Sequence, residues 1–392
     1  MSLPPSPDWR ARVRPEAAAL ETSGIVEVFD YGRGRPGLIP LWVGEGDAPT
    51  PAFIVEAGKA SLDRGETFYT YQAGVPELRA AIARYMNAHY GPGSDPERFF
   101  VTVGGMHALD IAVRLTVGPG GEALVLSPAW PNFAGALAAN GARARFVELQ
   151  ATPDWRLDPA RLEAAITPAT RAIIFNSPAN PTGYVATREE LQATLDIARR
   201  RGLWIVADEI YGRLVYGMER APSFHDVMAP DDNILFVQTL SKNWAMTGWR
   251  IGWLEAPAEL GPVIENLIQY STSGVNVPAQ RAATAALEQG EAFVAEQRAR
   301  FERNRDIMVA GLLATGRVEL AAPAGAFYAF PRILGVNDTR ALAFRLIDEA
   351  GVGVAPGYAF GPGGEGRLRL CFAHAPAQIE EVTRRLAAWL TS

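Results

Sequence analysis

Short apolar runs alternate with longer helical patterns through the middle of the chain. The runs are EALVLS (122–127), TRAIIFN (170–176), LWIVADEI (203–210), NILFVQTL (233–240) and RIGWLEA (250–256). Unbroken apolar runs of this length are typical of strands covered on both faces, and REELQATLDIARRRG (188–202) between them has a helical pattern. The alternation predicts an α/β fold with a mostly parallel central sheet flanked by helices.

Helical patterns also flank this region. PELRAAIARYMNAHY (76–90) begins with proline, carries apolar residues at helical spacing, and should end at Gly91. A charged helical pattern runs from about residue 278 to about residue 316, with a break or bend expected at Gly290. Beyond it, strand and helix patterns are mixed, which predicts a smaller α+β domain.

The length of 392 residues favours two domains. We expect residues 1–45 to form an N-terminal segment that packs with the small domain, and residues 46–285 to form the large α/β domain. Residues 286–392 should supply the connecting helix and the small C-terminal α+β domain.

Composition narrows the classes of partner. With 37 basic and 43 acidic residues the net charge is -6, and the densest basic stretch, AEQRARFERNR (295–305), is interleaved with glutamates, so no nucleic acid partner is expected. No window reaches the roughly 18 apolar residues of a membrane span. Cys371 is the single cysteine, and with His374 nearby it does not make a metal site. We expect a cytoplasmic protein without metal.

Three glycine patterns, GRGRPG (32–37), GPGGEA (118–123) and GPGGEG (361–366), match a loose dinucleotide motif. Each precedes a strand-like run instead of following one, so they predict turns. FFVTVGGMHALDIAVRL (99–115) is different, because a strand leads through glycines directly into a helix. The N-H groups of Gly105, Met106 and His107 would lie at the positive end of that helix and could bind phosphate, although a plain turn explains the motif equally well by itself.

Polar and aromatic residues follow the ends of the predicted strands. These are Trp130, Asn180, Asp208, Tyr211 and Lys242. Taken singly, Trp130 could be core packing and Asp208 a helix cap. Ligands of open α/β sheets bind at the carboxyl ends of the strands, and together with the phosphate-binding turn these residues predict a planar, phosphorylated, nitrogen-containing cofactor held by lysine as an imine.

The chain resembles the class I/II aminotransferases, pyridoxal-phosphate enzymes of fold type I in the aspartate aminotransferase superfamily. The motifs that carry the resemblance are NPTG (180–183), ADEIY (207–211) and SKNWAMTGWRIGW (241–253). The resemblance implies pyridoxal 5'-phosphate as cofactor, an amino acid and a 2-oxo acid as substrates, and a homodimer with shared active sites.

The resemblance also implies roles around the cofactor ring. Lys242 would hold the cofactor as a Schiff base and then act as the base that moves the α-proton. Asp208 would pair with the pyridine nitrogen, while Asn180 and Tyr211 would contact the 3-oxygen. Trp130 would stack on the ring.

The phosphate would be held by Thr239, Ser241 and Arg250. Within the family pattern Tyr69 would reach the phosphate of the neighbouring subunit's cofactor, and Tyr71 is close enough in sequence to leave that assignment open.

For the substrate, the resemblance assigns the α-carboxylate to Arg369, with Asn180 and the backbone of Gly44 beside it. Arg367 would point the same way from a strand, so only the family pattern separates the two arginines.

Other functions use the same residues. A C-S or other β-lyase, an amino-acid decarboxylase and a cyclising synthase differ from an aminotransferase in pocket shape, not in fold. A regulator that senses amino acids would need a DNA-binding module, and the segment before Leu41 is too short for one. The sequence favours an aminotransferase and leaves the substrate side chain open.

Overall fold

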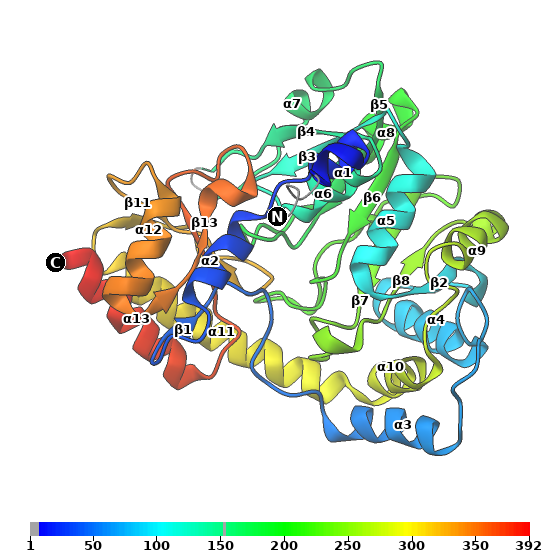
Figure 1. Ribbon diagram of the computed structural model, residues 1–392. Helices are drawn as coiled ribbons and strands as arrows, with labels where there is room; N and C mark the ends of the chain where they lie inside the picture. The colour runs from blue at the N-terminus through cyan, green and yellow to red at the C-terminus, as the bar shows by residue number, and fades with distance from the viewer. Residues whose placement is uncertain (1–7, 152–153) are drawn as a thin grey trace, which may run out of the picture.

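The computed structural model describes residues 8–151 and 154–392. Its centre is a seven-stranded sheet in the order β2-β8-β7-β6-β5-β3-β4 (Figure 1). The strands are β2 (Phe99–Thr102), β3 (Glu122–Ser127), β4 (Arg143–Glu148), β5 (Thr170–Asn176), β6 (Trp204–Asp208), β7 (Ile234–Thr239) and β8 (Gly252–Glu255). Only β8 pairs antiparallel with its neighbours β2 and β7, so the predicted mostly parallel sheet is confirmed.

The apolar runs lie in this sheet where the sequence predicts them, but β4 was not predicted. Its sequence, RARFVE, has an exposed or half-exposed residue at all but one position, because β4 forms the edge of the sheet and is only partly covered. An edge strand of this kind lacks the continuous apolar run that identifies a fully covered strand.

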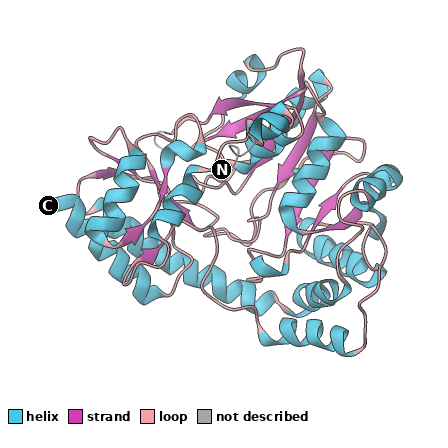
Figure 2. Cartoon of the chain, viewed as in Figure 1, coloured by secondary structure: helices cyan, strands magenta, loops and turns pink. Residues whose placement is uncertain are grey.

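Helices cover both faces of the sheet (Figure 2). The helices of this part of the chain are α3 (Ala52–Asp63), α4 (Pro76–Tyr90), α5 (Gly104–Thr116), α6 (Asn132–Ala139), α7 (Pro159–Ala164), α8 (Arg188–Arg201), α9 (Gly261–Gln269) and α10 (Val277–Gln289), and α3 packs on α10. The predicted helix at 188–202 is confirmed. α8 begins with a capping box between Thr187 and Glu190 and ends at Gly202, whose φ of 64° favours glycine.

Gly290 separates α10 from the long connecting helix α11 (Glu291–Leu313), as the sequence predicts. The remaining elements are β9 (Val318–Glu319), β10 (Tyr328–Ala329), β11 (Arg332–Ile333), α12 (Thr339–Arg345), β12 (Val352–Gly353), β13 (Ala355–Pro356), β14 (Leu368–Cys371) and α13 (Pro376–Thr391). α12 is short because it passes into a π-helical turn at Leu346–Ala350.

The N-terminal part of the chain lies against these later elements. It contains α1 (Pro15–Ala18), α2 (Gly24–Gly32) and β1 (Ile39–Pro40), and β1 pairs in parallel with β12. Glu27 on α2 forms an ion pair with Arg340 on α12. α2 is therefore anchored to α12.

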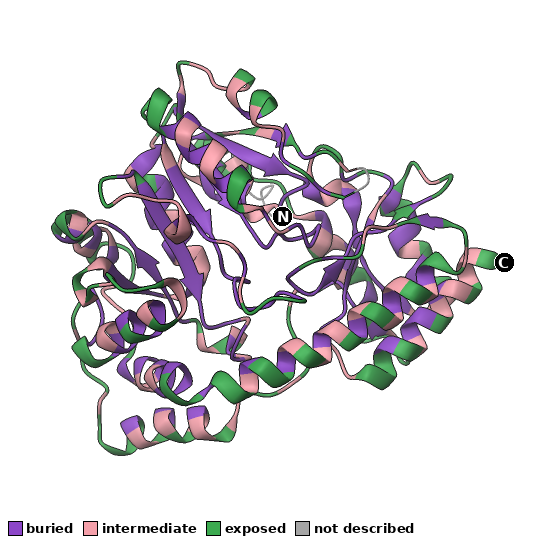
Figure 3. Ribbon diagram, turned by 180° about the vertical axis from the view of Figure 1, so that it is seen from behind, coloured by how far each residue is buried: buried purple, intermediate pink, exposed green. Residues whose placement is uncertain are grey.

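Burial follows the layers. Figure 3 shows the strands of the central sheet mostly buried, apart from the edge strand β4, while α11 has one buried and one exposed face along its length. No helix in the described residues is long and apolar enough to cross a membrane. The carboxyl ends of β5, β6 and β7 meet at one edge of the sheet, and polar residues follow each of them.

Candidate active site

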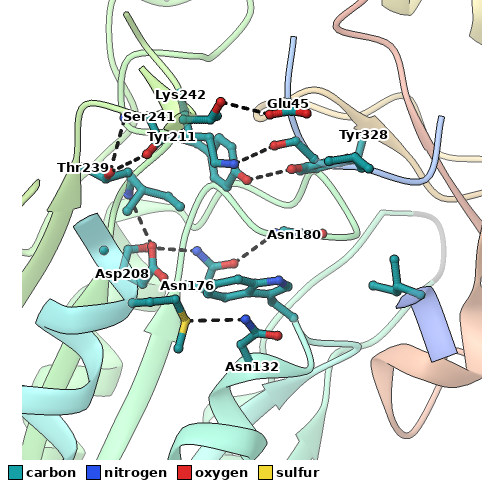
Figure 4. Close-up of a pocket in the computed structure, with 18 of the residues that line it drawn as sticks. Glu45, Asn132, Asn176, Asn180, Asp208, Tyr211, Thr239, Ser241, Lys242 and Tyr328 are labelled. Carbon is teal, nitrogen blue, oxygen red and sulfur yellow. Dashed lines mark hydrogen bonds between the residues drawn. The ribbon is translucent and has the colours of Figure 1, made fainter. Parts of the chain in front are cut away.

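A cavity of about 480 Å³ opens at this edge of the sheet, closed on the other side by α2, β10 and β14. Figure 4 shows labelled side chains from both sides pointing into it. Most of the residues singled out in the sequence line it. They are Gly44, Gly105, Met106, Trp130, Asn180, Asp208, Tyr211, Thr239, Ser241, Lys242, Arg250 and Arg369.

Lys242 lies three residues beyond the end of β7 and supplies the primary amine of the cavity. Its Nζ donates a hydrogen bond to the carbonyl oxygen of Gly44 at 2.6 Å. Removal from bulk water lowers the pKa of Lys242 to about 8. A substantial fraction of the amine is therefore neutral near physiological pH and can act as a nucleophile or base.

Asp208 is the last residue of β6, and its side chain is 2% exposed. Burial raises its pKa to about 7, against the opposing effect of the Ile210 N-H and of the Lys242 charge. The Ile210 N-H donates to Oδ1 at 3.4 Å. A carboxyl group held in this way favours a cationic partner in the cavity, because a positive charge would restore the ionised form.

Asn176 joins two of these groups through the end of β5. Its Nδ2 donates to the carbonyl oxygen of Asp208 at 3.0 Å, and its Oδ1 accepts from the N-H of Asn180, also at 3.0 Å. Asn176 therefore fixes the turn that carries Asn180 against the end of β6. The sequence analysis did not single out Asn176. Like Asp208, it is a polar residue at the carboxyl end of an apolar strand, and this position could have identified it.

One guanidinium and two hydroxyl groups lie near the start of α5. The helix begins at Gly104, whose φ is +75°, and a Cβ added there would lie 2.7 Å from Nη2 of Arg250. Thr239 Oγ1 donates to Ser241 Oγ at 2.9 Å beside the same cavity. A helix N-terminus, a guanidinium and hydroxyl groups together make a cradle for a dianion.

Two tyrosines from different elements are in contact in the wall of the cavity. The hydroxyl groups of Tyr211 and of Tyr328 on β10 lie 2.8 Å apart. Figure 4 labels both side chains. Burial raises the pKa of Tyr211 well above its usual value. Gly44 lies directly against Tyr328, and a side chain at this position would collide with the phenol.

Arg369 on β14 is 2% exposed and reaches the cavity from the side opposite the central sheet. Its Nη1 donates to Oδ1 of Asn180 at 3.2 Å, and its Nη2 donates to the carbonyl oxygen of Trp42. Within the described residues its buried Nε has no hydrogen-bond partner. Such a guanidinium can still donate a hydrogen bond to the carboxylate of a ligand.

Arg367 occupies a different place. Its guanidinium lies over the ring of Trp155, 4.8 Å from the centroid, and its Nη1 donates to the carbonyl oxygen of Phe330 at 3.4 Å. It is not among the residues that line the cavity. The two arginines, equivalent in the sequence pattern, therefore have different surroundings.

Two predicted site residues do not line the cavity in this chain. The His107 ring accepts from the Val103 N-H at 3.2 Å and contacts Ser271 Oγ at 2.8 Å, so its side chain caps the start of α5. Tyr69 is 94% exposed on the molecular surface.

The comparisons with known proteins agree with one another. Residues 36–386 match the family described as aminotransferase class I and II. The aspartate/prephenate aminotransferase of Thermus thermophilus is 35% identical, over 94% of this chain and 96% of that protein. The aromatic-amino-acid aminotransferase 2 of Thermococcus litoralis is 34% identical, over 94% of this chain and 95% of that protein.

A solved structure gives the same result for the fold. The aspartate aminotransferase from Thermus thermophilus with maleate superimposes with a TM-score of 0.89 at 35% identity, and the match covers 96% of this chain and 99% of that chain. The predicted fold type I is confirmed. The chain therefore belongs to the class I and II aminotransferases, and it is an enzyme that transfers amino groups.

Proposed function

We propose that this aminotransferase uses pyridoxal 5'-phosphate, bound through Lys242, to move the amino group between an L-amino acid and a 2-oxo acid. The observation that carries the proposal is the presence in one cavity of the Lys242 amine, the buried Asp208 carboxyl group and a cradle for a dianion. These three features match the aldehyde-bearing, pyridine and phosphate parts of the cofactor. When bound, pyridoxal phosphate supplies an electron sink for the charge that develops at the substrate α-carbon.

Different residues would hold the phosphate, the pyridine nitrogen, the ring oxygen and the ring face of the cofactor. The N-H groups of Gly105, Met106 and His107, with Thr239, Ser241 and Arg250, would hold the phosphate. Asp208 would keep the pyridine nitrogen protonated, and Asn180 and Tyr211 would hydrogen-bond the ring oxygen. Trp130 would cover one face of the ring.

Lys242 and Arg369 would act on the substrate. Arg369 would bind the α-carboxylate, with the Gly44 backbone and Asn180 beside it, and so orient the α-hydrogen. The Lys242 amine, with its pKa lowered to about 8 by burial, would act as the base that takes up and moves that proton.

The proposal includes a homodimer. Two neighbouring segments carry four exposed aromatic residues, Phe68, Tyr69, Tyr71 and Tyr270. A hydrogen bond of 2.8 Å from Gln72 to Gln269 links the two segments. Exposed aromatic clusters of this kind favour a protein interface. Across that interface Tyr69 would contact the phosphate in the partner's site, with Tyr71 as the alternative.

We also propose the division into residues 1–45, 46–285 and 286–392. The pairing of β1 with β12 supports the association of the first segment with the small domain. The second boundary would fall inside α10, one turn before Gly290.

A half-reaction tests the function. The loaded enzyme is mixed with an amino acid in the absence of any oxo acid, and released products are measured. An aminotransferase should produce one equivalent of the corresponding 2-oxo acid per active site and then stop, because its cofactor has taken up the amino group. Continuous release of ammonia or carbon dioxide would instead assign the site to a lyase or decarboxylase.

A further inference from the structure

We propose that the substrate of this site carries an apolar side chain, aromatic or branched aliphatic, and not a second carboxylate. The inference rests on the proposed function and specifies its substrate class. It concerns the part of the cavity wall formed by Ile25, Val26 and Phe29 of α2 together with Trp42 and Val43, which we call the apolar wall.

The apolar wall leaves carbon surface uncovered. Val26 is 45% exposed and Val43 is 38% exposed, and Ile25 and Phe29 are half-buried. Phe29 packs edge-to-face on Trp42 with ring centroids 5.8 Å apart. A ligand with an apolar side chain would remove this surface from water, which is the main source of affinity in such pockets.

α2 is fixed in a position that presents this wall. Ser23 caps its first turn by accepting from the Ile25 N-H, and Glu27 binds Arg340 and Tyr358 on the outer side. Gly24 packs directly against the Tyr358 ring. Ile25, Val26 and Phe29 lie on the opposite face of the helix from these contacts and therefore face the cavity.

Under the proposed function, each basic side chain of the cavity already binds the cofactor or the substrate α-carboxylate. Among the described residues that line it, the basic ones are Lys242, Arg250 and Arg369, which would serve the cofactor, its phosphate and the substrate α-carboxylate. The acid Glu45 also lines the cavity and accepts from Thr247 Oγ1 at 2.9 Å. A second substrate carboxylate would thus meet apolar carbon and a negative charge, which is unfavourable without a cationic partner.

The loops proposed to reach the partner's site add no cation. Residues 66–75 and 270–276 contain neither lysine nor arginine. Arg281, which shares a surface groove with Tyr69, is paired with Glu66 and Glu77 at 3.2 Å. Arg33 and Arg35 line the groove next to the cavity instead of the cavity itself, and Arg35 is paired with Asp348.

Binding of unreactive analogues to the loaded enzyme tests the proposal by calorimetry. 3-Phenylpropanoate and 4-methylpentanoate carry the carboxylate with an apolar side chain, whereas succinate and maleate carry two carboxylates. At least one apolar analogue should bind at least about tenfold more tightly than either dicarboxylate, given the apolar area it would bury. Tighter binding of succinate or maleate, or of the cationic analogue 5-aminopentanoate, would overturn the proposal.

A matched pair of variants separates the wall from general charge effects. Val26→Arg adds a cation to the apolar wall and should reverse the preference toward dicarboxylates. Leu313→Arg, at a position 44% exposed at the end of α11 and outside the cavity, should leave it unchanged. An unchanged preference in Val26→Arg, with the fold intact by circular dichroism, would contradict the assigned wall.

The outcome also distinguishes this inference from the function on which it rests. Normal cofactor uptake and a completed half-reaction with a preference for dicarboxylates would overturn the substrate class alone. Failure to take up pyridoxal phosphate would overturn the proposed function.

Discussion

Arg369 and Arg367 offer a paired test of how the substrate is held. Both lie on or beside β14, two residues apart, but Arg369 lines the cavity while Arg367 stacks on Trp155. We consider Arg369→Lys and Arg367→Lys, which keep the charge and remove the planar fork of the guanidinium. Only the first change should affect the binding of an amino acid.

The magnitude follows from the hydrogen bonds at stake. In Arg369, Nη1 binds Asn180 at 3.2 Å, Nη2 binds the Trp42 carbonyl, and Nε has no partner in the described chain. A lysine would lose at least one charged hydrogen bond to the substrate carboxylate, worth about 1.5–3 kcal/mol. This corresponds to a KM for the amino acid that is about 10- to 150-fold higher.

Steady-state kinetics with the amino acid varied measures this effect, and the affinity for pyridoxal phosphate and the thermal midpoint serve as controls. Arg369→Lys should raise KM for the amino acid and leave cofactor affinity within about twofold, since no cofactor contact is removed. Arg367→Lys should leave KM unchanged. Equal KM effects in both variants, or a larger effect in Arg367→Lys, would refute the assignment of Arg369 to the α-carboxylate.

The remaining predictions concern three residues of the proposed cofactor site, Lys242, Asp208 and Tyr69. The pKa of Lys242 lies at about 8, so its amine is protonated below that pH and neutral above it. The rate of cofactor uptake by the cofactor-free enzyme should therefore rise about tenfold per pH unit and level off above pH 8. A flat rate profile measured by absorbance would contradict this. Asp208→Asn should lower turnover by at least about a hundredfold, as expected for loss of a buried charge partner. Burial raises the Asp208 pKa to about 7, so ionising it costs stability as pH rises toward and through that value, and the cofactor-free Asn variant should melt at a higher temperature than wild type at about pH 8; a lower midpoint would be inconsistent. Tyr69→Phe should weaken retention of pyridoxal phosphate on gel filtration without changing the midpoint of the cofactor-free protein, and a loss confined to Tyr71→Phe would transfer that role to Tyr71.

The sequence predicted best those parts of the site that depend on the succession of strands, turns and helices along the chain. Asn180 and Lys242 follow apolar strands and Asp208 ends one. Parallel strands bring their carboxyl ends to one edge, so these three distant positions could be placed together without coordinates. The α-helix start at Gly104 followed from the strand-glycine-helix order in the same way.

The missed parts depend on packing between segments that are far apart in sequence. Tyr328 meets Tyr211 only because β10, in a separate sheet and far along the chain, packs against the residues that follow β6. The apolar residues of α2 face the cavity only because Glu27 and Gly24 anchor the other side of the helix to Arg340 and Tyr358. No pattern within α2 itself distinguishes this arrangement from ordinary core packing.

The most direct test of the account is the attachment point of the cofactor. The chain contains two lysines, Lys59 and Lys242, and Lys59 lies on the surface of α3 in an ion pair with Glu56 at 2.8 Å. Borohydride converts a carbon-nitrogen double bond between pyridoxal phosphate and a lysine into a stable amine, which peptide mass spectrometry can locate. We predict one pyridoxyl group on the peptide that contains Lys242, its loss in Lys242→Arg and its retention in Lys59→Arg; a label on Lys59, or none on Lys242 in the active enzyme, would contradict the account.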